Sequence, residues 1–261
     1  MATLIIAAHK QFKPPADPAY LPVFVGAALH EWEEDVPPYL PDNTGDNISL
    51  KNPLYCELTG LYFAWKNLKQ ETLGLVHYRR YFAGKGKDVL TSEALERILS
   101  EADVILPKKQ NYVIETLYSH YKHTHDARQL DETRRIIEEV SPEYLESFDR
   151  VMKKRSAHMF NMMVMKQPWL DRYLKWLFEI LFRLEKRFEL KESSAYQRRY
   201  CGRIAEILLN VWLDREIRGG LLAKDRVAVL PVVYLGKVNW LKKGSAFLKA
   251  KFLHQRYKES F

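Results

Sequence analysis

Several features that mark large protein classes are scarce or missing in this sequence. Only two of its 261 residues are cysteines, Cys56 and Cys201, which are too few for a disulfide framework or a zinc site. Charged residues interrupt every apolar stretch well before the roughly 18 residues that a membrane span needs. The opening residues, MATLIIAAHK, lack the basic segment of a signal peptide and predict a first strand. We therefore expect a globular protein in a reducing, cytoplasmic setting, at most peripherally attached to the inner face of the membrane.

Two familiar motifs for nucleotide and metal binding are also missing. No glycine-rich run ends in Gly-Lys followed by Ser or Thr, which argues against a P-loop nucleotidase. Three histidines, His120, His123 and His125, lie close together beside Asp126 and invite comparison with a metal site. No His-Glu-x-x-His or similar ligand spacing accompanies them, however. We expect a loop that faces a substrate or solvent here, and no bound metal.

The formal net charge of +8 is concentrated at one end of the chain. From Lys237 onward there are seven basic residues and one acid, Glu259, so the preceding body is close to neutral. Aromatic and aliphatic residues alternate with the lysines in this tail, as in a basic amphipathic helix that lies on an anionic membrane surface. A terminal helix packed on the body is the alternative. We expect a single domain over residues 1–236 and a basic amphipathic tail over residues 237–261.

Strand and helix patterns alternate along the body. Continuous apolar runs at residues 3–9 and 72–77 are typical of strands in a sheet covered on both faces. A loop rich in Pro, Asp and Gly separates them, from about residue 13 to 52. This order predicts an α/β fold with a mostly parallel central sheet flanked by helices and a more helical C-terminal half. Further strands are expected at 103–107, 158–165 and 226–235, and helices at 52–67, 92–101, 127–140, 142–153, 168–189 and 196–217.

Polar residues suited to a ligand follow two of the expected strands. His9 and Lys10 follow the first, and residues 77–80 end the second with a histidine, a tyrosine and two arginines. Ligands of open α/β sheets bind at the carboxyl ends of strands. Two guanidiniums and a nearby lysine would hold a diphosphate, because their donors match phosphate oxygens. The alternative is that Arg79 and Arg80 pair with surface carboxylates.

The stretch PDNTGDNISLKN, before the first expected helix, allows two interpretations. Its Asp, Asn and Gly residues suit tight turns, which is the structural interpretation. Its backbone N–H groups, Lys51 and the helix start near Asn52 also form a place where an anion is welcome.

Polar residues interrupt the apolar periodicity of two later segments. His158 and Asn161 lie in HMFNMMVM, and Arg203 and Glu206 lie in QRRYCGRIAEILLNVWL. Arg203 and Glu206 are three residues apart, so they could be an ordinary helix pair. A buried Glu206 could instead act as a general base with a pKa raised by burial. Both interpretations stay open on the sequence.

Seven short motifs follow one another along the body. They are Ala8-His9-Lys10, GDNIS with Lys51-Asn52, YCELTGLYFAWKN, GLVHYRRYF, DVILP, HMFNMMVM and CGRIAEILLNVWL. In this order they resemble a family of bacterial capsular and exopolysaccharide biosynthesis proteins. The family, formerly described as a domain of unknown function, is regarded as glycosyltransferases, and members are implicated as galactofuranosyltransferases. The resemblance covers nearly the whole chain before the basic tail.

The resemblance implies a GT-A-like fold and a nucleotide-sugar-dependent transferase. Candidates for the general base that deprotonates an acceptor hydroxyl are Glu206, Asp46 and His158. Acceptor-side candidates are His120, His123, Asn161 and Arg203. Glu57 lies in the motif helix, where its role could be structural. The residues that would line the donor side are His9, Lys10, Asp46, Asn47, Lys51, Asn52, His77, Tyr78, Arg79 and Arg80.

Enzymes of this kind often carry an Asp-x-Asp motif, which holds a divalent metal, at the strand end near the donor diphosphate. The sequence has no Asp-x-Asp, and residues 77–80 occupy what looks like the corresponding place. We therefore hypothesise that Arg79 and Arg80 neutralise the leaving diphosphate in place of a metal. No cofactor is expected on this view, and a divalent metal such as manganese is the alternative.

The resulting expectation is a glycosyltransferase that uses a nucleotide-sugar, with UDP-galactofuranose as the donor that the resemblance favours. Its acceptor would be a lipid-linked or growing surface polysaccharide. Expected partners are this donor, the glycan acceptor and, through the tail, an anionic membrane surface, but no nucleic acid. The alternatives are a nucleic-acid-binding protein, suggested by the basic charge and paired arginines, and a non-catalytic scaffold of polysaccharide assembly.

Overall fold

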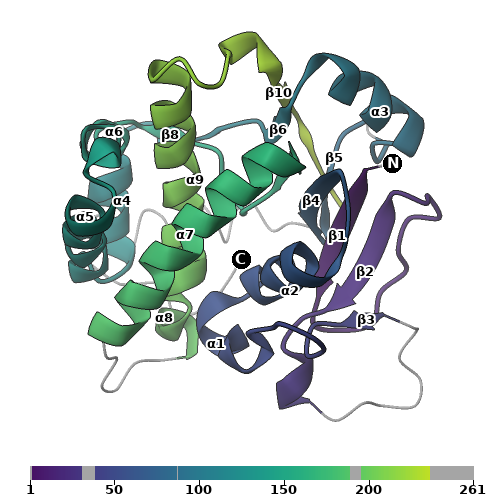
Figure 1. Ribbon diagram of the computed structural model, residues 1–261, viewed down its shortest axis with the longest axis horizontal. Coiled ribbons are helices and arrows are strands. Elements are labelled where there is room, and N and C mark those ends of the chain that lie inside the picture. Colours follow the sequence, from purple (N-terminus) through teal and green to yellow (C-terminus); the bar gives the residue numbers. More distant parts are fainter. Residues whose placement is uncertain (1, 31–38, 87, 189–194, 236–261) are drawn as a thin grey trace. The chain divides into compact units, whose positions relative to one another are not determined.

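The computed structural model describes residues 2–30, 39–86, 88–188 and 195–235, and these residues form two compact units (Figure 1). The first, here called the sheet unit, takes the described residues within 1–108, 160–175 and 222–235. The second, the helical unit, takes those within 109–159 and 176–221. The expected single domain over residues 1–236 stays a prediction, and the expected tail over residues 237–261 lies outside the described residues.

A nine-stranded sheet is the centre of the sheet unit in the described part of the chain. Its main path consists, in order, of β10 (Val227–Leu230), β6 (Val104–Pro107), β9 (Met163–Lys166), β4 (Thr72–His77), β1 (Thr3–Ala8), β2 (Tyr20–Phe24) and β3 (Leu40–Pro41). β5 (Arg80–Phe82) pairs with both β4 and β11 (Val232–Tyr234). β9 is antiparallel to its two neighbours, while the path strands on either side of it pair in parallel. The expected α/β fold with a mostly parallel central sheet is confirmed.

The register brings three strand ends to the same edge of the sheet. β1 lies between β2 and β4, and Ala7 pairs with Val23 on one side and His77 on the other. Because the three strands are parallel, the residues that follow Ala8, Phe24 and His77 share one edge, here called the carboxyl edge. The segment before β9 reaches the same edge, since β9 is antiparallel to β4.

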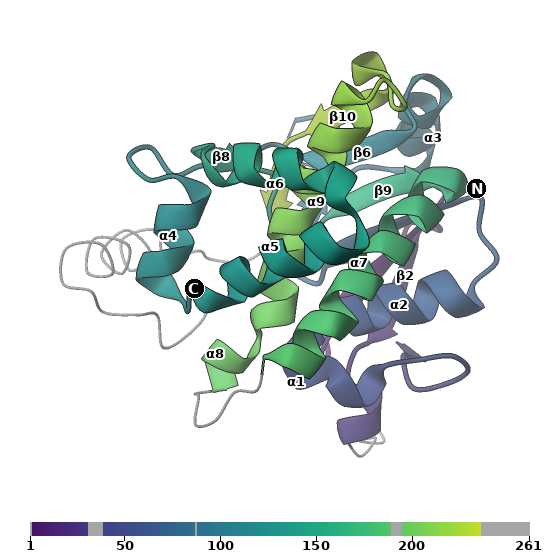
Figure 2. The ribbon, with the colours of Figure 1, turned by 60° about the vertical axis from the view of Figure 1, so that its left-hand side comes forward.

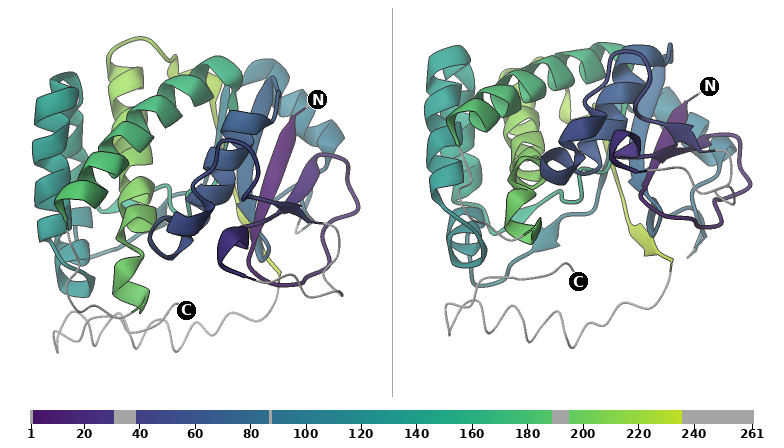
Figure 3. Two further views of the ribbon diagram at one scale, coloured as in Figure 1. Left: turned by 60° about the horizontal axis from the view of Figure 1, so that its bottom comes forward. Right: turned by 90° about the horizontal axis from the view of Figure 1, so that it is seen from below.

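One face of the sheet is covered by α2 (Leu58–Asn67), which lies alongside β1 (Figures 1 and 3). Gly60 permits the close approach, because a Cβ atom there would lie 2.8 Å from a Val25 methyl carbon. The helix belongs to the crossover between the parallel strands β1 and β4, so it runs back against the strand direction. Its first residues therefore lie at the carboxyl edge.

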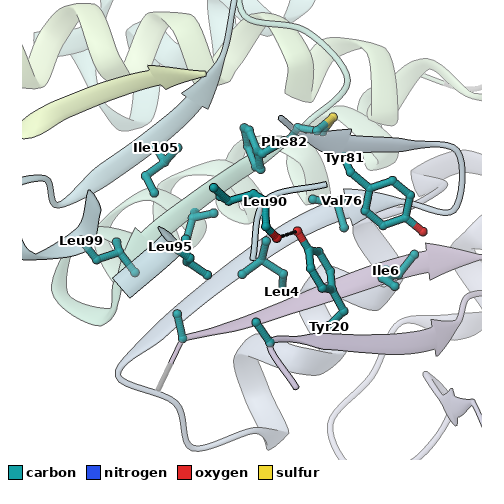
Figure 4. Close-up of a cluster of buried hydrophobic side chains, with 14 residues drawn as sticks. Leu4, Ile6, Tyr20, Val76, Tyr81, Phe82, Leu90, Leu95, Leu99 and Ile105 are labelled. Atoms are coloured by element: carbon teal, nitrogen blue, oxygen red, sulfur yellow. Dashed lines mark hydrogen bonds between the residues drawn. The ribbon is translucent and has the colours of Figure 1, made fainter. Parts of the chain in front are cut away.

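The other face is covered by α3 (Ser92–Glu101), which shares a buried cluster with β1 (Figure 4). Leu95 and Leu99 of the helix belong to the same apolar cluster as Leu4. Within this cluster the Tyr20 hydroxyl donates to the Leu90 carbonyl oxygen at 2.7 Å. Both faces are thus apolar, as the continuous apolar runs predict.

The helix expected over residues 52–67 is broken in the middle. α1 (Asn52–Tyr55) ends at Cys56, whose φ of 54° is left-handed, and α2 begins after Glu57. Asn52 Nδ2 donates to the Cys56 carbonyl oxygen at 2.9 Å, and the same oxygen accepts from the Thr59 backbone N–H at 3.2 Å, so hydrogen bonds link α1 and α2 across the break. The apolar periodicity continues across the break, so the sequence pattern does not reveal it.

The segment expected as a loop from about residue 13 to 52 also contains regular structure. It holds β2, β3 and two 3-10 turns, Ala27–Leu29 and Ser49–Lys51. Pro22 makes β2 hard to recognise in the sequence, because proline has no N–H group to donate a hydrogen bond to a neighbouring strand. It is tolerated because it pairs with Ile6 at a position where β3 has not yet begun its own pairing with β2.

Two expected strands are shorter than the sequence predicts. Residues 158–162 do not form a strand, because Phe160 and Asn161 adopt φ angles of 74° and 53°, and β9 begins only at Met163. Residues 226–235 divide at Pro231 into β10 and β11. The two pieces then pair with different strands, β6 and β5.

The helical unit packs helices around α9 (Tyr200–Arg218) (Figure 2). The Trp212 side chain of this helix is fully buried. The expected loop around residues 120–126 is wrong, because most of these residues belong to α4 (Leu117–Thr124), which starts with a capping box between Thr116 and Ser119. The more helical C-terminal half is confirmed. The remaining elements are α4 (Leu117–Thr124), α5 (Arg128–Val140), α6 (Leu145–Met152), the later part of α7 (Gln167–Arg187), α8 (Ala195–Arg198), β7 (Gln110–Asn111) and β8 (Ser156–Ala157). Across the residues described, no helix is both long and apolar enough to cross a membrane.

Candidate active site

A tight hairpin at the carboxyl edge presents the paired arginines. β4 and β5 are joined by a two-residue turn, Tyr78 and Arg79, so that His77 pairs directly with Arg80. The Arg79 carbonyl oxygen accepts a hydrogen bond of 2.9 Å from the Leu235 backbone N–H, just after β11. The turn is therefore fixed both by the pairing of β4 with β5 and by the hydrogen bond from Leu235. These contacts fix the backbone positions from which its side chains extend.

The Arg80 guanidinium lies against two aromatic rings, those of Phe160 and Tyr234, which also contact each other edge-on. Its Cζ is 4.6 Å from the centroid of the Phe160 ring and 5.9 Å from that of Tyr234. Burial raises the pKa of Tyr234, and the nearby charge of Arg80 acts in the opposite direction. Cation–π contacts of this kind hold the guanidinium flat and desolvated on one side.

The Nε–H of Arg80 is buried and has no hydrogen-bond partner among the described residues. The described carboxylates also form no ion pair with Arg79 or Arg80. A buried donor without an acceptor costs about 1–3 kcal/mol, so such a group is rare unless a ligand supplies the acceptor. Within the described ranges, the expected alternative of arginines paired with surface acids is therefore not found.

Three other polar side chains of the carboxyl edge lie around the Tyr78 ring. The Lys10 ammonium lies 5.5 Å and the Arg79 guanidinium 5.1 Å from the centroid of its ring. The His9 ring meets it edge-on, with 5.2 Å between the centroids. His9, Lys10 and Arg79 are all exposed. The ends of β1 and β4 together thus present positive charge to solvent around one aromatic ring.

The segment before β9 closes the other side of the hairpin. His77 Nε2 donates to the Phe160 carbonyl oxygen at 2.6 Å. Asn161 is almost fully buried, and its Nδ2 donates to Glu57 Oε1 at 2.7 Å. Glu57, at the start of α2, and Arg80, on β5, are therefore joined through two adjacent residues of one loop. Of the acceptor-side candidates, Asn161 is the one in the sheet unit.

The loop after β2 is fixed by a buried aspartate. Asp42 is fully buried and accepts hydrogen bonds from the backbone N–H groups of Gly26, at 2.9 Å, and Ala27, at 3.0 Å. The Ser49 hydroxyl also donates to it. Its contacts give Asp42 a structural role, which supports the turn interpretation of this stretch.

The four donor-side candidates of this stretch make local contacts. Asp46 is exposed and binds the far end of α2, where its N–H donates to Asn67 Oδ1 at 3.1 Å. Asn47 Oδ1 accepts from the Ser49 N–H at 3.1 Å. Asn52 caps the break before α2, and Lys51 ends the preceding 3-10 turn. Asp46 therefore lies about 15 Å along α2 from the carboxyl edge, at 1.5 Å per residue.

In the helical unit, two of the histidines that the sequence singles out contact one carboxylate. His120 Nδ1 lies 2.8 Å and His123 Nδ1 2.6 Å from the two oxygens of Glu115, which is 3% exposed. Burial alone would raise the pKa of Glu115, but the hydrogen bonds from the two imidazoles outweigh it and hold that pKa below its ordinary value. The Tyr112 ring lies against His120, with 4.2 Å between the centroids. Glu115 carries no sequence signal that would have linked it to the histidines.

The remaining candidates also belong to the helical unit. His158 is 3% exposed, and its backbone N–H donates to Asn210 Oδ1 at 2.9 Å. Asn210 Nδ2 donates in turn to the carbonyl oxygens of His158 and Glu206, both at 2.8 Å. Arg203 donates to the Gln197 carbonyl oxygen at 2.8 Å. Glu206 is half-buried, and its role as a base stays a prediction.

Residues 3–217 match the family model described as "Domain of unknown function (DUF4422)". The chain belongs to this family. It is also similar to the apo structure of WbbM, a bifunctional glycosyltransferase, with a TM-score of 0.82 and 28% identity over 90% of this chain. The chain spans 45% of the WbbM chain, that is, about half of its length. A search of the curated proteins found no match.

For this DUF4422 protein, the structure brings together at the carboxyl edge the candidates from β1 and β4. It adds two residues that sequence reasoning missed, Phe160 and Tyr234, whose rings contact Arg80. It also places Glu57, whose role the sequence left open, in contact with the loop before β9. The sequence marks the stretches that contain these three residues, because each stretch has either a family motif or a strand pattern. It does not indicate that the residues meet.

The residues of this DUF4422 site do not suit a divalent metal. Hard cations such as manganese prefer carboxylate oxygens, and the hairpin offers a histidine, a tyrosine and two arginines instead. Within the described ranges, no group of three or more His, Cys, Asp or Glu residues is arranged to hold a metal ion. Independence of metal nevertheless stays a prediction, and a chelator tests it below.

Proposed function

We propose that this protein is a glycosyltransferase that transfers a sugar from a nucleotide-sugar to a glycan acceptor. The observation that carries the proposal is the buried, unpartnered Nε–H of Arg80 at the carboxyl edge. Similarity to WbbM supports the same class of reaction, since WbbM is described as a glycosyltransferase. An anionic diphosphate is the ligand that suits the cations at this edge.

Transfer requires the diphosphate to accept negative charge as its bond to the sugar breaks. The Arg80 fork can donate to a phosphate oxygen while the aromatic rings keep it in place. Arg79 and Lys10 are near enough to share one aromatic neighbour and add two further charges. Preorganised positive groups of this kind stabilise a leaving group most when its charge is fully developed.

The finer parts of the proposal rest on the sequence resemblance. UDP-galactofuranose is the proposed donor, and a lipid-linked or growing surface polysaccharide is the proposed acceptor. The Tyr78 ring offers a surface on which a base or sugar could stack. Peripheral attachment to an anionic membrane would come from residues 237–261, and liposome pelleting with and without these residues tests it.

A thermal-shift panel tests the function. Purified protein is mixed with UDP, UDP-galactofuranose, UDP-galactopyranose, UDP-glucose and other nucleotide-sugars, each with and without manganese. A ligand that binds only the native state increases the free energy of unfolding, by about 2.7 kcal/mol at a hundredfold excess over its Kd. The melting temperature rises as a result. We expect a shift with a UDP-sugar and slow release of UDP from it. Binding of a polynucleotide without any thermal shift from a nucleotide-sugar would favour the nucleic-acid-binding alternative. Binding of a nucleotide-sugar without its turnover would favour the non-catalytic scaffold.

A further inference from the structure

Glu57 lies at the carboxyl edge in an unusual backbone setting. It directly precedes α2 and follows Cys56, whose φ is 54°. Its Oε1 accepts from Asn161, whose φ is 53°, and Phe160 before it has a φ of 74°. Left-handed backbone is unfavourable for most residues other than glycine and asparagine, and residues held in it cluster at functional sites. Three such residues here surround one carboxylate.

The two oxygens of this carboxylate are in different situations. Oε1 is held by Asn161 Nδ2 at 2.7 Å. Among the described residues, Oε2 has no hydrogen-bond partner, and Glu57 forms no ion pair with a described cation. The side chain is half-buried, and Oε2 is not one of the buried atoms without a partner, so it is open to solvent or a ligand. One oxygen is fixed and the other is left for a ligand.

The loop before β9 places this carboxylate close to the proposed diphosphate site. Phe160, adjacent to Asn161, provides the ring against which the Arg80 guanidinium lies, 4.6 Å from its centroid. Its carbonyl oxygen also binds His77. A sugar whose diphosphate is bound at Arg80 would thus have a carboxylate near it, positioned from α2. Asp46, by contrast, is attached to the opposite end of that helix.

We propose that Glu57 is the general base of the transfer, which rests on the glycosyltransferase function proposed above. Its Oε2 takes the proton of the acceptor hydroxyl while the acceptor oxygen forms a bond to the anomeric carbon of the sugar. The bond from that carbon to the phosphate oxygen breaks, and its electron pair leaves with the diphosphate, whose charge Arg80 neutralises. Asn161 is a positioning residue, because it holds Oε1 and so directs Oε2.

The test uses the full chain and Glu57→Gln, which keeps an oxygen able to accept from Asn161 but removes the base. UDP release is measured with the UDP-sugar that gives the largest thermal shift, with water as acceptor. We expect kcat to fall about 10²–10⁴-fold, while KM and the UDP-sugar shift stay within about twofold of the wild type. Glu71→Gln changes an exposed glutamate of the same unit and should leave kcat unchanged.

Asn161→Gly tests the positioning role, because glycine accepts the left-handed backbone at this position without strain. We expect a loss of about tenfold or more in kcat with little change in KM, since the carboxylate is kept but misdirected. A variant that only lost stability would instead show a lower melting temperature with normal kcat below it.

The outcomes separate this inference from the proposed function. Wild-type kcat in Glu57→Gln would overturn the inference and leave the proposed function intact. Loss of the UDP-sugar shift in Glu57→Gln would also overturn it, since Glu57 would then bind the donor or maintain the fold. If wild-type protein neither bound nor turned over any nucleotide-sugar, the proposed function would be refuted, and this inference with it.

Discussion

Replacing Arg80 with alanine removes the group on which the proposed diphosphate site depends. The substitution deletes a guanidinium whose Nε–H is buried without a described partner and which contacts the rings of Phe160 and Tyr234. The backbone of β5 does not need the side chain, since its pairing with β4 and β11 uses main-chain groups. The fold is therefore expected to survive.

The magnitudes follow from the contacts. Loss of the two cation–π contacts destabilises the protein by about 0.5–2 kcal/mol. Removal of a buried, unsatisfied donor stabilises it by about 1–3 kcal/mol. These effects largely cancel, so we expect the melting temperature without ligand to change by no more than about 4 °C. Loss of one preorganised donor to developing charge costs about 2.7–4 kcal/mol, or 10²–10³-fold in kcat.

The assay is UDP release from the UDP-sugar that shifts the wild-type melting temperature. Arg80→Ala is compared with Arg97→Ala, which removes an exposed arginine of α3 that forms no described ion pair. Arg80→Lys should recover little of the loss, because an ammonium cannot reproduce the planar fork. The reasoning is refuted if Arg80→Ala keeps wild-type kcat, or if Arg97→Ala loses as much activity.

Three further predictions concern metal dependence and stability. UDP release by the wild-type protein should persist in excess EDTA; its loss in EDTA and return with manganese would show that a metal takes part. The hydrogen bond from Arg226, aided by Lys166, lowers the pKa of Asp103 to about 2. This contribution to stability is present above about pH 4 and is lost as the pH falls toward 2. Asp103→Asn should therefore cost about 1–3 kcal/mol at pH 7 and reduce the pH dependence of urea midpoints between pH 6 and 2; an unchanged pH dependence would contradict this. Gly74→Ala should destabilise the sheet by about 1–3 kcal/mol, because the added Cβ would lie 2.8 Å from the Met163 carbonyl oxygen; a wild-type urea midpoint would show that the strands separate easily.

The sequence predicts the core of the sheet better than its margins. β1 and β4 are evident because both faces of the sheet are buried and their apolar runs are continuous. α3 matches its expected bounds, residues 92–101, because Thr91 accepts a hydrogen bond from the N–H of Ala94 at the N-cap. β2 is hidden by Pro22, since its fit depends on where β3 begins to pair. Local patterns cannot report such tertiary pairings.

Only part of the candidate site, the residues at the ends of β1 and β4, was predictable from the sequence. The strand ends at His9-Lys10 and at residues 77–80 meet because parallel neighbours end at one edge, which is a general property of such sheets. The groups that hold Arg80 come from Phe160 and Tyr234, which are 80 and 154 residues farther along the chain. Their positions depend on left-handed backbone and on a strand that returns beside β5, and neither leaves a periodic signal.

A structure of the protein with a non-hydrolysable UDP-sugar analogue, determined in EDTA, tests the account most directly. We expect the diphosphate at the carboxyl edge, with a phosphate oxygen within about 3 Å of the Arg80 Nε, as a charge-assisted hydrogen bond requires. A diphosphate bound elsewhere, with Arg80 Nε still lacking an acceptor, would contradict the account.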